Sequence, residues 1–243
     1  MSSDTNKAVL QRFFDEAWHQ KNADIADELF TADYVLHDPG NPWISPGPQG
    51  IREMVTAYNH AFPDARFTIE HQIAEGDWVV TRWVVRSTHA GNLLDLAATG
   101  RESQTSGILF SRLEGSKIKE EWTQWNRQGL LEELGADDHA SFDQPPTLEG
   151  WRTVLVTLRE AFPDLAFTQT RQVTEGDLVA YQGTWRGTHL GEFSGLAPTE
   201  RLVEVGEHRL YRVRDGQVVE HWQEQDTAGL LRQLGVGNRD GRP

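Results

Sequence analysis

The side chains best suited to proton transfer in this sequence lie on one predicted strand, residues 118–125. Alternation along a strand sends every second side chain to the same face, which here carries a carboxylate, an amide and a tryptophan. This mixture is typical of a pocket wall, where burial raises the pKa of a carboxyl group toward neutrality and lets it take and return a proton. The residues on this face are Ile118, Glu120, Trp122, Gln124 and Asn126.

The same strand recurs one hundred positions later. Its corresponding face carries Val218, Glu220, Trp222, Glu224 and Asp226. Glu120 and Glu220 therefore occupy the same place in two strands. Two roles fit them equally well, a carboxylate in a cavity or one partner of a structural salt bridge.

A second candidate segment for acid–base chemistry begins at His37. A histidine side chain has the unperturbed pKa nearest physiological pH, and Asp38 places a carboxylate beside it. Trp43, in the loop that follows, is a candidate for the mouth of a pocket. The alternative for Asp38 is structural, because Asp before Pro commonly forms a turn.

Histidine and tryptophan supply the remaining candidates. His89 and His189 each follow a strand in a Thr-His-x-Gly turn, where a hydrogen bond that holds the turn fits as well as a place in a pocket. The nine tryptophans are more than composition predicts, and some can form flat walls for an aromatic or polycyclic ligand. The candidates for such walls are Trp43, Trp83, Trp122, Trp185 and Trp222.

Other chemistries lack their residues in this sequence. There is no cysteine, which excludes disulfides, thiolate nucleophiles and thiolate metal ligands. No HExxH or other close pair of histidine ligands appears, no GxSxG surrounds a serine, and no glycine-rich phosphate loop is present. We therefore expect neither a metal site nor a cofactor.

Composition and charge restrict the class of protein. The 243 residues are 37% hydrophobic and 25% charged, as in ordinary globular proteins. The formal net charge of −14 argues against a nucleic-acid partner, since binding to phosphates needs a basic surface. The N-terminus has neither a basic start nor an apolar stretch typical of a signal peptide, and no apolar run reaches the roughly 18 residues of a membrane span. We expect a cytoplasmic protein without membrane contacts.

The candidate residues lie within an internal duplication. Residues 50–136 return as residues 150–236 at a constant offset of one hundred, with roughly a third of the paired positions identical. Two copies, each large enough for a core, indicate tandem globular domains. Examples are AFPD at residue 61 and residue 161, Glu75-Gly76-Asp77 with Glu175-Gly176-Asp177, and GLL at residue 129 and residue 229.

Hydrophobic spacing and Pro or Gly boundaries predict the same elements in each copy. In the first copy these are a helix at 48–62, strands at 66–74, 78–87, 103–113 and 118–125, and a short helix at 129–134. Pro63 ends the first helix and Gly135 the last. A helix followed by a curled antiparallel sheet is an α+β plan.

The two copies differ before residues 50 and 150. The first is preceded by predicted helices at 6–20 and 25–30 and a strand at 34–37, whereas the second is preceded by a loop rich in Pro and Asp. We therefore predict a complete domain at 1–136, a linker at 137–148 and a domain truncated at its N-terminal side at 149–243.

The order and spacing of these motifs resemble the SnoaL-like polyketide cyclases over nearly the whole chain except the linker. In the first copy the motifs are His37-Asp38-Pro39, Gly50-Ile51-Arg52, Ala61-Phe62-Pro63-Asp64, Glu75-Gly76-Asp77, Thr88-His89-Ala90-Gly91, Glu120-Glu121-Trp122 and Gly129-Leu130-Leu131. In the second copy they include Gly187-Thr188-His189-Leu190-Gly191, Ala197-Pro198-Thr199, Asp215-Gly216 and Glu220-His221-Trp222.

This resemblance implies two tandem domains of the nuclear-transport-factor-2-like fold, cones in which helices and a curved sheet enclose an apolar pocket. It also implies cofactor-free aldol closure of a polyketide ester, with one carboxylate as acid and base. The family's acid/base aspartate matches Asp226, whereas the first copy has Asn126, which cannot exchange a proton. Asp226 is alternatively the N-cap of a helix that starts near residue 227.

Our leading hypothesis is a cofactor-independent enzyme that acts on a small hydrophobic carbonyl compound, in the complete cone or in a pocket shared by the copies. The rival is a binding protein that has kept the pocket and lost the chemistry, as Asn126 and the truncated second copy suggest. A third hypothesis is another reaction of the superfamily, such as isomerisation, dehydration or hydrolysis. We expect the copies to pair through their sheets as an intramolecular pseudo-dimer, either monomeric or in a homodimer whose second chain covers the truncated copy.

Overall fold

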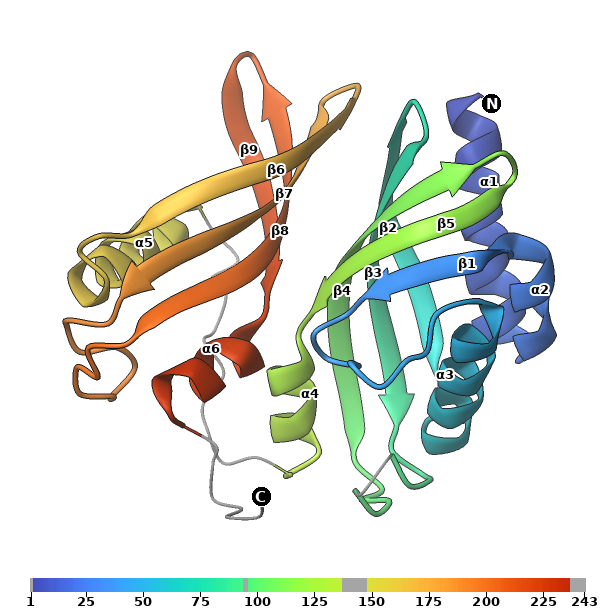
Figure 1. Ribbon diagram of the computed structural model, residues 1–243, viewed down its shortest axis with the longest axis horizontal. Helices are drawn as coiled ribbons and strands as arrows, with labels where there is room; N and C mark the ends of the chain where they lie inside the picture. Colours follow the sequence, from blue (N-terminus) through green and yellow to red (C-terminus); the bar gives the residue numbers. More distant parts are fainter. Residues whose placement is uncertain (1, 94–95, 137–147, 237–243) are drawn as a thin grey trace.

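Two β-sheets organise the chain, one in each copy of the duplication (Figure 1). The computed structural model describes residues 2–93, 96–136 and 148–236. The first sheet has the order β1-β5-β4-β3-β2 and the second the order β6-β7-β8-β9. The strands are β1 (Phe30–His37), β2 (Arg66–Glu75), β3 (Trp78–Thr88), β4 (Glu102–Glu114), β5 (Lys117–Trp125), β6 (Ala166–Glu175), β7 (Leu178–Thr188), β8 (Leu202–Arg214) and β9 (Gln217–Gln225).

The helices begin and end at residues with clear local reasons. Ser2 caps the first helix, because its side chain accepts a hydrogen bond from the backbone N–H of Thr5. The third helix has Pro48 in its first turn and ends before Pro63. The helical elements are α1 (Ser3–Phe13), a π-helical turn (Phe14–His19), a 3₁₀ turn (Ala23–Ile25), α2 (Ala26–Leu29), α3 (Pro48–Ala61), α4 (Arg127–Glu133), α5 (Leu148–Ala161) and α6 (Thr227–Leu234).

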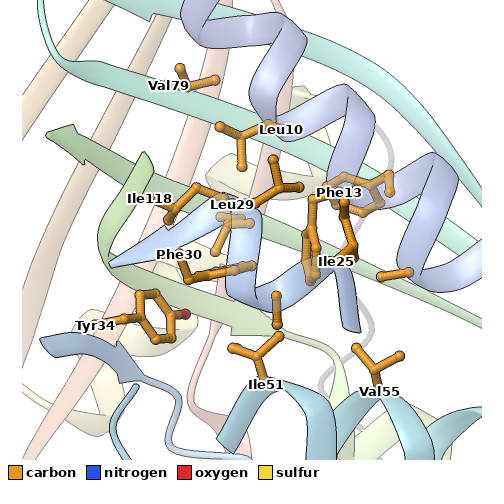
Figure 2. Close-up of a cluster of buried hydrophobic side chains, with 14 of the residues drawn as sticks. Leu10, Phe13, Ile25, Leu29, Phe30, Tyr34, Ile51, Val55, Val79 and Ile118 are labelled. Atoms are coloured by element: carbon orange, nitrogen blue, oxygen red, sulfur yellow. The ribbon is translucent and has the colours of Figure 1, made fainter. Parts of the chain in front are cut away.

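The core of the N-terminal domain lies between its helices and its sheet. α1, α2 and α3 gather on the side of the first sheet that faces away from the second sheet (Figure 1). Their apolar side chains meet those of β1, β3 and β5 in one buried cluster, which fixes the helices onto the sheet because each buried large side chain contributes about 1.5–3 kcal/mol. Figure 2 labels Leu10, Phe13, Ile25, Leu29, Phe30, Tyr34, Ile51, Val55, Val79 and Ile118 of this cluster.

The second domain has a smaller core. Phe162 and Trp185 lie at its centre, between α5, α6 and the sheet. The described residues contain no counterpart of α1, α2 or β1 in this domain, so Phe167 on β6 is 42% exposed, whereas Phe67 packs against the first core. The two-domain α+β fold with a truncated second cone, predicted from sequence, is confirmed. The predicted linker, up to residue 147, lies outside the described residues.

The two sheets contact each other through their outer faces. Eight buried apolar residues, four from each sheet, form a shared cluster, which also includes Trp78, Trp122 and Trp222 at its edges. The edge strands β2 and β6 exchange equivalent bonds: Glu75 accepts a hydrogen bond from the backbone N–H of residue 174 at 2.8 Å, and Glu175 accepts one from residue 74 at 3.0 Å. The copies thus pack sheet to sheet within one chain, with the near-twofold reciprocity that a duplication predicts.

Several repeated motifs hold the fold together. Asp64 accepts hydrogen bonds from the backbone N–H of Thr88 at 2.8 Å and from its hydroxyl at 2.7 Å, and the same pair recurs in the second copy. A Cβ on Gly91 would lie 2.3 Å from the carbonyl oxygen of His60, so a larger residue does not fit there. Much of the repeated sequence therefore specifies structure.

Candidate functional site

The N-terminal cone encloses a cavity of about 140 Å³ between its helices and its sheet. The wall is largely apolar, and its aromatic part comes from α1, the π-helical turn, α3, β2, β3 and β5. Polar groups enter it from α3, β1, β3, β4, β5 and the loop after β1. The polar and aromatic lining residues considered below are Trp18, Tyr34, Asp38, Asn41, Tyr58, Asn59, Trp83, Thr105, Glu121, Thr123 and Trp125.

A β-bulge determines which side chains of β5 face this cavity. Beyond Ile118, which lies in the core of the cone, β5 carries one extra residue, Lys119, relative to its partner β4. An extra residue reverses the alternation of side chains beyond it. Glu121, Thr123 and Trp125 consequently line the cavity.

Beyond the bulge, the face predicted for the pocket points toward the second domain, so Glu120, Trp122 and Gln124 do not line the cone cavity. Trp122 packs at the cluster between the sheets, and Gln124 lines a cleft between the domains. Glu120 is ion-paired with Arg112 at 2.9 Å and lies 3.0 Å from Nε2 of His37. Glu120 therefore has the second of its two expected roles, that of a partner in a structural salt bridge.

The corresponding residues of the second copy also serve structural roles. Glu220 is ion-paired with Arg212 at 2.7 Å, and its side chain is 47% exposed. Asp226 caps α6, since its carboxylate accepts a hydrogen bond from the backbone N–H of Gly229 at 2.7 Å. Asn126 caps α4 in the same way, with a bond of 2.9 Å. Neither cap residue belongs to the cavity wall of the cone.

Glu121 is the most perturbed acid in the cone. It is 3% exposed, and its two carboxylate oxygens accept hydrogen bonds from Tyr34 Oη at 2.7 Å and from Ser111 Oγ at 2.6 Å. Burial raises the pKa of Glu121 to about 7, although both hydroxyl bonds act to lower it. Such a carboxyl group can exist in either protonation state near neutral pH.

Asp38 is the second acid of the cavity wall. Its carboxylate accepts bonds from the backbone N–H of Gly40 and from Asn41 Nδ2, both at 2.8 Å, and from Trp125 Nε1 at 3.1 Å. Burial raises the pKa of Asp38 despite these donors. Tyr58 donates to Asn41 Oδ1 at 2.8 Å and extends the network. Asp38 thus forms the turn expected from sequence and also lines the cavity.

Two polar atoms of the cavity wall are buried without partners. Thr105 Oγ1 and Asn59 Oδ1 form no hydrogen bond with any described residue. A buried polar group without a partner costs about 1–3 kcal/mol. Their position on the wall therefore favours a ligand that bonds to them.

His37 and His89 lie outside the cavity wall. His37 stacks on Trp122 with ring centres 4.9 Å apart, and its side chain is 46% exposed toward the second domain. His89 is fully buried, and its Nδ1 accepts a hydrogen bond from the backbone N–H of Thr99 at 3.2 Å. His189 repeats this contact, so both follow the structural alternative for the turn.

The five candidate tryptophans have different surroundings. Trp83 lines the cone cavity. Trp122 and Trp222 lie at the interface between the sheets, and Trp185 is a core residue of the second domain, 1% exposed. Trp43 is partly buried in the loop before α3 and is not part of the cavity wall.

The second domain presents a polar concave face in place of an apolar cavity. Its open groove contains Glu207 and Arg209, which are ion-paired at 2.7 Å. Four side chains that line or support the first cavity are replaced at the equivalent positions of the second copy. Trp83 is replaced by Gly183, Leu109 by Arg209, Ser111 by Tyr211 and Glu121 by His221. Of the two concave faces formed by the described residues, the first is therefore the one suited to an apolar ligand.

Sequence reasoning missed the polar residues on the true cavity face. Glu121 was missed because the bulge at Lys119 leaves no pattern that strand periodicity can detect. Tyr34 and Thr105 lie on β1 and β4, and no motif in the sequence singled them out. The adjacent acids Glu120 and Glu121 were the available signal, since one of two neighbours on a strand must face each side.

Two further findings concern the described part of the chain. It holds no group of three or more His, Asp or Glu side chains arranged to bind a metal ion. None of its helices combines the length and apolar character that a membrane span requires.

Comparison with known proteins follows the duplication. A family model described as SnoaL-like polyketide cyclase matches residues 8–134 and again residues 136–234. Aklanonic acid methyl ester cyclase DnrD of Streptomyces peucetius is 29% identical over 148 residues, 59% of this chain and 95% of that protein. Nogalonic acid methyl ester cyclase of Streptomyces nogalater is 27% identical over 137 residues, 56% of this chain and 97% of that protein.

Solved structures also match about half of the chain. A protein of Acidithiobacillus ferrooxidans is 32% identical with a TM-score of 0.50, covering 56% of this chain and 98% of that one. TsrD of Streptomyces laurentii, at 22% identity and a TM-score of 0.52, covers 56% of this chain and 99% of that one and shows the fold alone.

Proposed function

This chain belongs to the SnoaL-like polyketide cyclase family, and we propose that its N-terminal cone carries out a cofactor-independent acid–base reaction on a hydrophobic carbonyl compound. The observation that carries the proposal is Glu121, a carboxyl group in an apolar cavity with its pKa raised to about 7. The names of the relatives, cyclases of polyketide methyl esters, support a substrate of that class.

The chemistry we propose is an intramolecular aldol closure. The Glu121 carboxylate removes a proton from a carbon flanked by carbonyl groups, and the resulting enolate carbon attacks a ketone carbonyl of the same molecule. A carbon–carbon bond forms, the carbonyl oxygen becomes an alkoxide, and Glu121 returns the proton to it. The product is an isomer of the substrate, so no co-reactant is needed.

Other groups of the cavity wall have supporting roles in this proposal. Tyr34 and Ser111 orient the Glu121 carboxylate through their hydroxyl bonds. The unpaired hydroxyl of Thr105 can donate a hydrogen bond to a substrate carbonyl oxygen, where negative charge develops. Asp38, fixed by its three donors, contributes a second carboxyl group to the cavity wall.

One observation favours a second candidate function, a binding protein without turnover. The position matched to the family's acid/base aspartate is a helix cap in both copies, Asn126 in the first and Asp226 in the second. A protein that had lost catalysis would keep the apolar cavity and its unpaired polar groups.

Turnover of aklanonic and nogalonic acid methyl esters by the full chain separates these functions. Liquid chromatography with mass detection should show a product of unchanged mass and altered retention, formed faster than without protein. Binding is followed by quenching of the tryptophan fluorescence, because Trp18, Trp83 and Trp125 line the cavity. Quenching without product supports the binding protein, and no quenching with either ester contradicts the proposed substrate class.

A further inference from the structure

A cleft between the two domains, with a volume of about 520 Å³, is separate from the cone cavity. One side is formed by the end of β1 and by β5, and the other by β6, β7 and β8. Among its lining residues Asp38 alone has a carboxyl group, and that group already accepts bonds from Gly40, Asn41 and Trp125. In a chain of net charge −14, this cleft is low in negative charge.

Arg171 on β6 gives the cleft a positive charge. Its guanidinium carbon lies 3.5 Å from the ring centre of Trp78 and 5.8 Å from that of Trp122. Its Nε is buried without a hydrogen-bond partner, and the guanidinium forms no ion pair with any described residue. Glu120 is close enough for its charge to act on the pKa of Arg171, but Glu120 is already ion-paired with Arg112.

An arginine on the other side of the interface, Arg82, shows how the protein neutralises such a cation. Arg82 lies over Trp222, 5.8 Å from its ring centre, and is ion-paired with Glu70 at 2.6 Å. In the duplication the counterpart of Arg82 is Gln182, and that of Arg171 is His71. The charge of Arg82 also lowers the pKa of Glu224, opposing the effect of burial. The arginine on that side therefore has two acids near it.

The cleft lacks both of these acids. The counterpart of Glu70 is Thr170, and the counterpart of Glu224 is Gln124, so each carboxylate is replaced by an uncharged side chain. Thr170 and Gln124 thus leave the cleft without the two acids that lie near Arg82. Arg82 is neutralised by the protein, whereas Arg171 forms no ion pair with a described residue.

We propose that this cleft binds a small aromatic carboxylate, with its carboxylate group on the guanidinium of Arg171. A planar guanidinium and a carboxylate match in two parallel hydrogen bonds. Gln124, Gln182 and His37 add hydrogen-bond donors around the same space. The His37 ring, stacked on Trp122 at an interplanar angle of 10°, gives the aromatic body of the ligand a flat wall.

This site goes beyond the proposed reaction and has a different ligand chemistry. The cone cavity disfavours an anion because its wall includes the buried acid Glu121, which does not line the cleft. A carboxylate should therefore prefer the cleft, whereas a neutral aromatic compound has no reason to do so. The comparison of a carboxylate with its amide is consequently diagnostic of the cleft, whatever the outcome of the turnover assay.

Calorimetric titration of the full chain with naphthalene-2-carboxylate and with naphthalene-2-carboxamide tests the proposal. The carboxylate should bind about tenfold more tightly than the amide, as expected for a charge-assisted bond. Raising the salt concentration from about 0.05 M to about 0.5 M should reduce this preference. Equal affinities of the wild type for the two compounds would overturn the proposal without any variant.

Arginine variants locate the site. Arg171→Gln should abolish the preference for the carboxylate, and Arg171→Lys should keep part of it because the charge remains without the fork geometry. Arg186→Gln removes an exposed arginine of the same domain and should leave the preference unchanged. An Arg171→Gln protein that unfolds cooperatively and still prefers the carboxylate tenfold would refute the assignment to the cleft.

Discussion

Glu120 and Glu121 are sequence neighbours in opposite surroundings. The side chain of Glu120 is a quarter exposed and is ion-paired with Arg112, whereas Glu121 is buried among apolar groups with two hydroxyl donors. The same functional group is therefore a surface ion-pair partner at one position and a candidate proton carrier at the next. Surroundings, and not residue type, distinguish the two acids.

Thr105 tests whether the cavity wall is adapted to a ligand. Thr105→Val removes a buried hydroxyl that has no partner among the described residues and keeps the side-chain shape. We expect the free energy of unfolding to rise by about 0.5–1 kcal/mol, because an unpaired polar group is lost. KM for the methyl esters should rise several-fold at the same time. Urea denaturation and steady-state kinetics check this, and lower stability with unchanged KM would contradict it.

At the scale of elements, local sequence predicted where helices and strands lie better than it predicted which face of a strand lines the cavity. Pro48 and Pro63 set the ends of α3, and the Glu-Gly-Asp turns set the hairpins, because these residues act through their own backbone. The bulge at Lys119 depends on pairing with β4 and β1, which the strand's own sequence does not show. Because β5 carries one extra residue, the face predicted to line the cavity lies at the domain interface instead.

The caps at the starts of α4 and α6 also belong to this scale. Asp226→Ala should lower the free energy of unfolding by about 1 kcal/mol, because the first-turn N–H of Gly229 loses its acceptor. Asp226→Asn keeps an acceptor and should remain close to wild type. Neither change should alter turnover of the esters. Thermal unfolding and product analysis check this, and a large loss of turnover in Asp226→Asn alone would instead make Asp226 an acid/base residue.

At the scale of the whole molecule, the duplication has produced two domains with different surfaces. The first keeps an apolar cone, and the second has lost the elements that would cover it and carries polar side chains on its concave face. The sequence repeat predicted the tandem fold and the pairing of sheets, and a pocket shared by the copies was one of the two places expected for the ligand. Which residues line the interdomain cleft was not predicted, because this follows from differences between paired positions such as Glu70 and Thr170.

Glu224 makes the domain interface dependent on pH. It is 6% exposed, bonds to Ser106 of the other domain, and has a pKa raised by burial to about 8, against 4.5 for an ordinary glutamate. The folded state therefore retains a proton that the unfolded chain releases, so stability falls as the pH rises from about 4.5 to about 8.

The matched variant for this effect is Glu224→Gln, which stays neutral at every pH. At about pH 8.5 it should be more stable than wild type by on the order of 5 kcal/mol, and near pH 4.5 the two should be alike. Urea denaturation at both pH values measures the difference. A constant difference across this range would contradict a proton held by Glu224.

The most direct test of the central claim compares Glu121→Gln with Glu120→Gln in turnover of the methyl esters. If Glu121 moves the proton in the N-terminal cone, Glu121→Gln should lower kcat/KM by about 100-fold or more, with binding measured by fluorescence unchanged. Glu120→Gln, which alters the neighbouring acid on the opposite face, should stay within about twofold of wild type. Full activity in Glu121→Gln, or an equal loss in both variants, would contradict the assignment of the reaction to the buried carboxyl group of the cone.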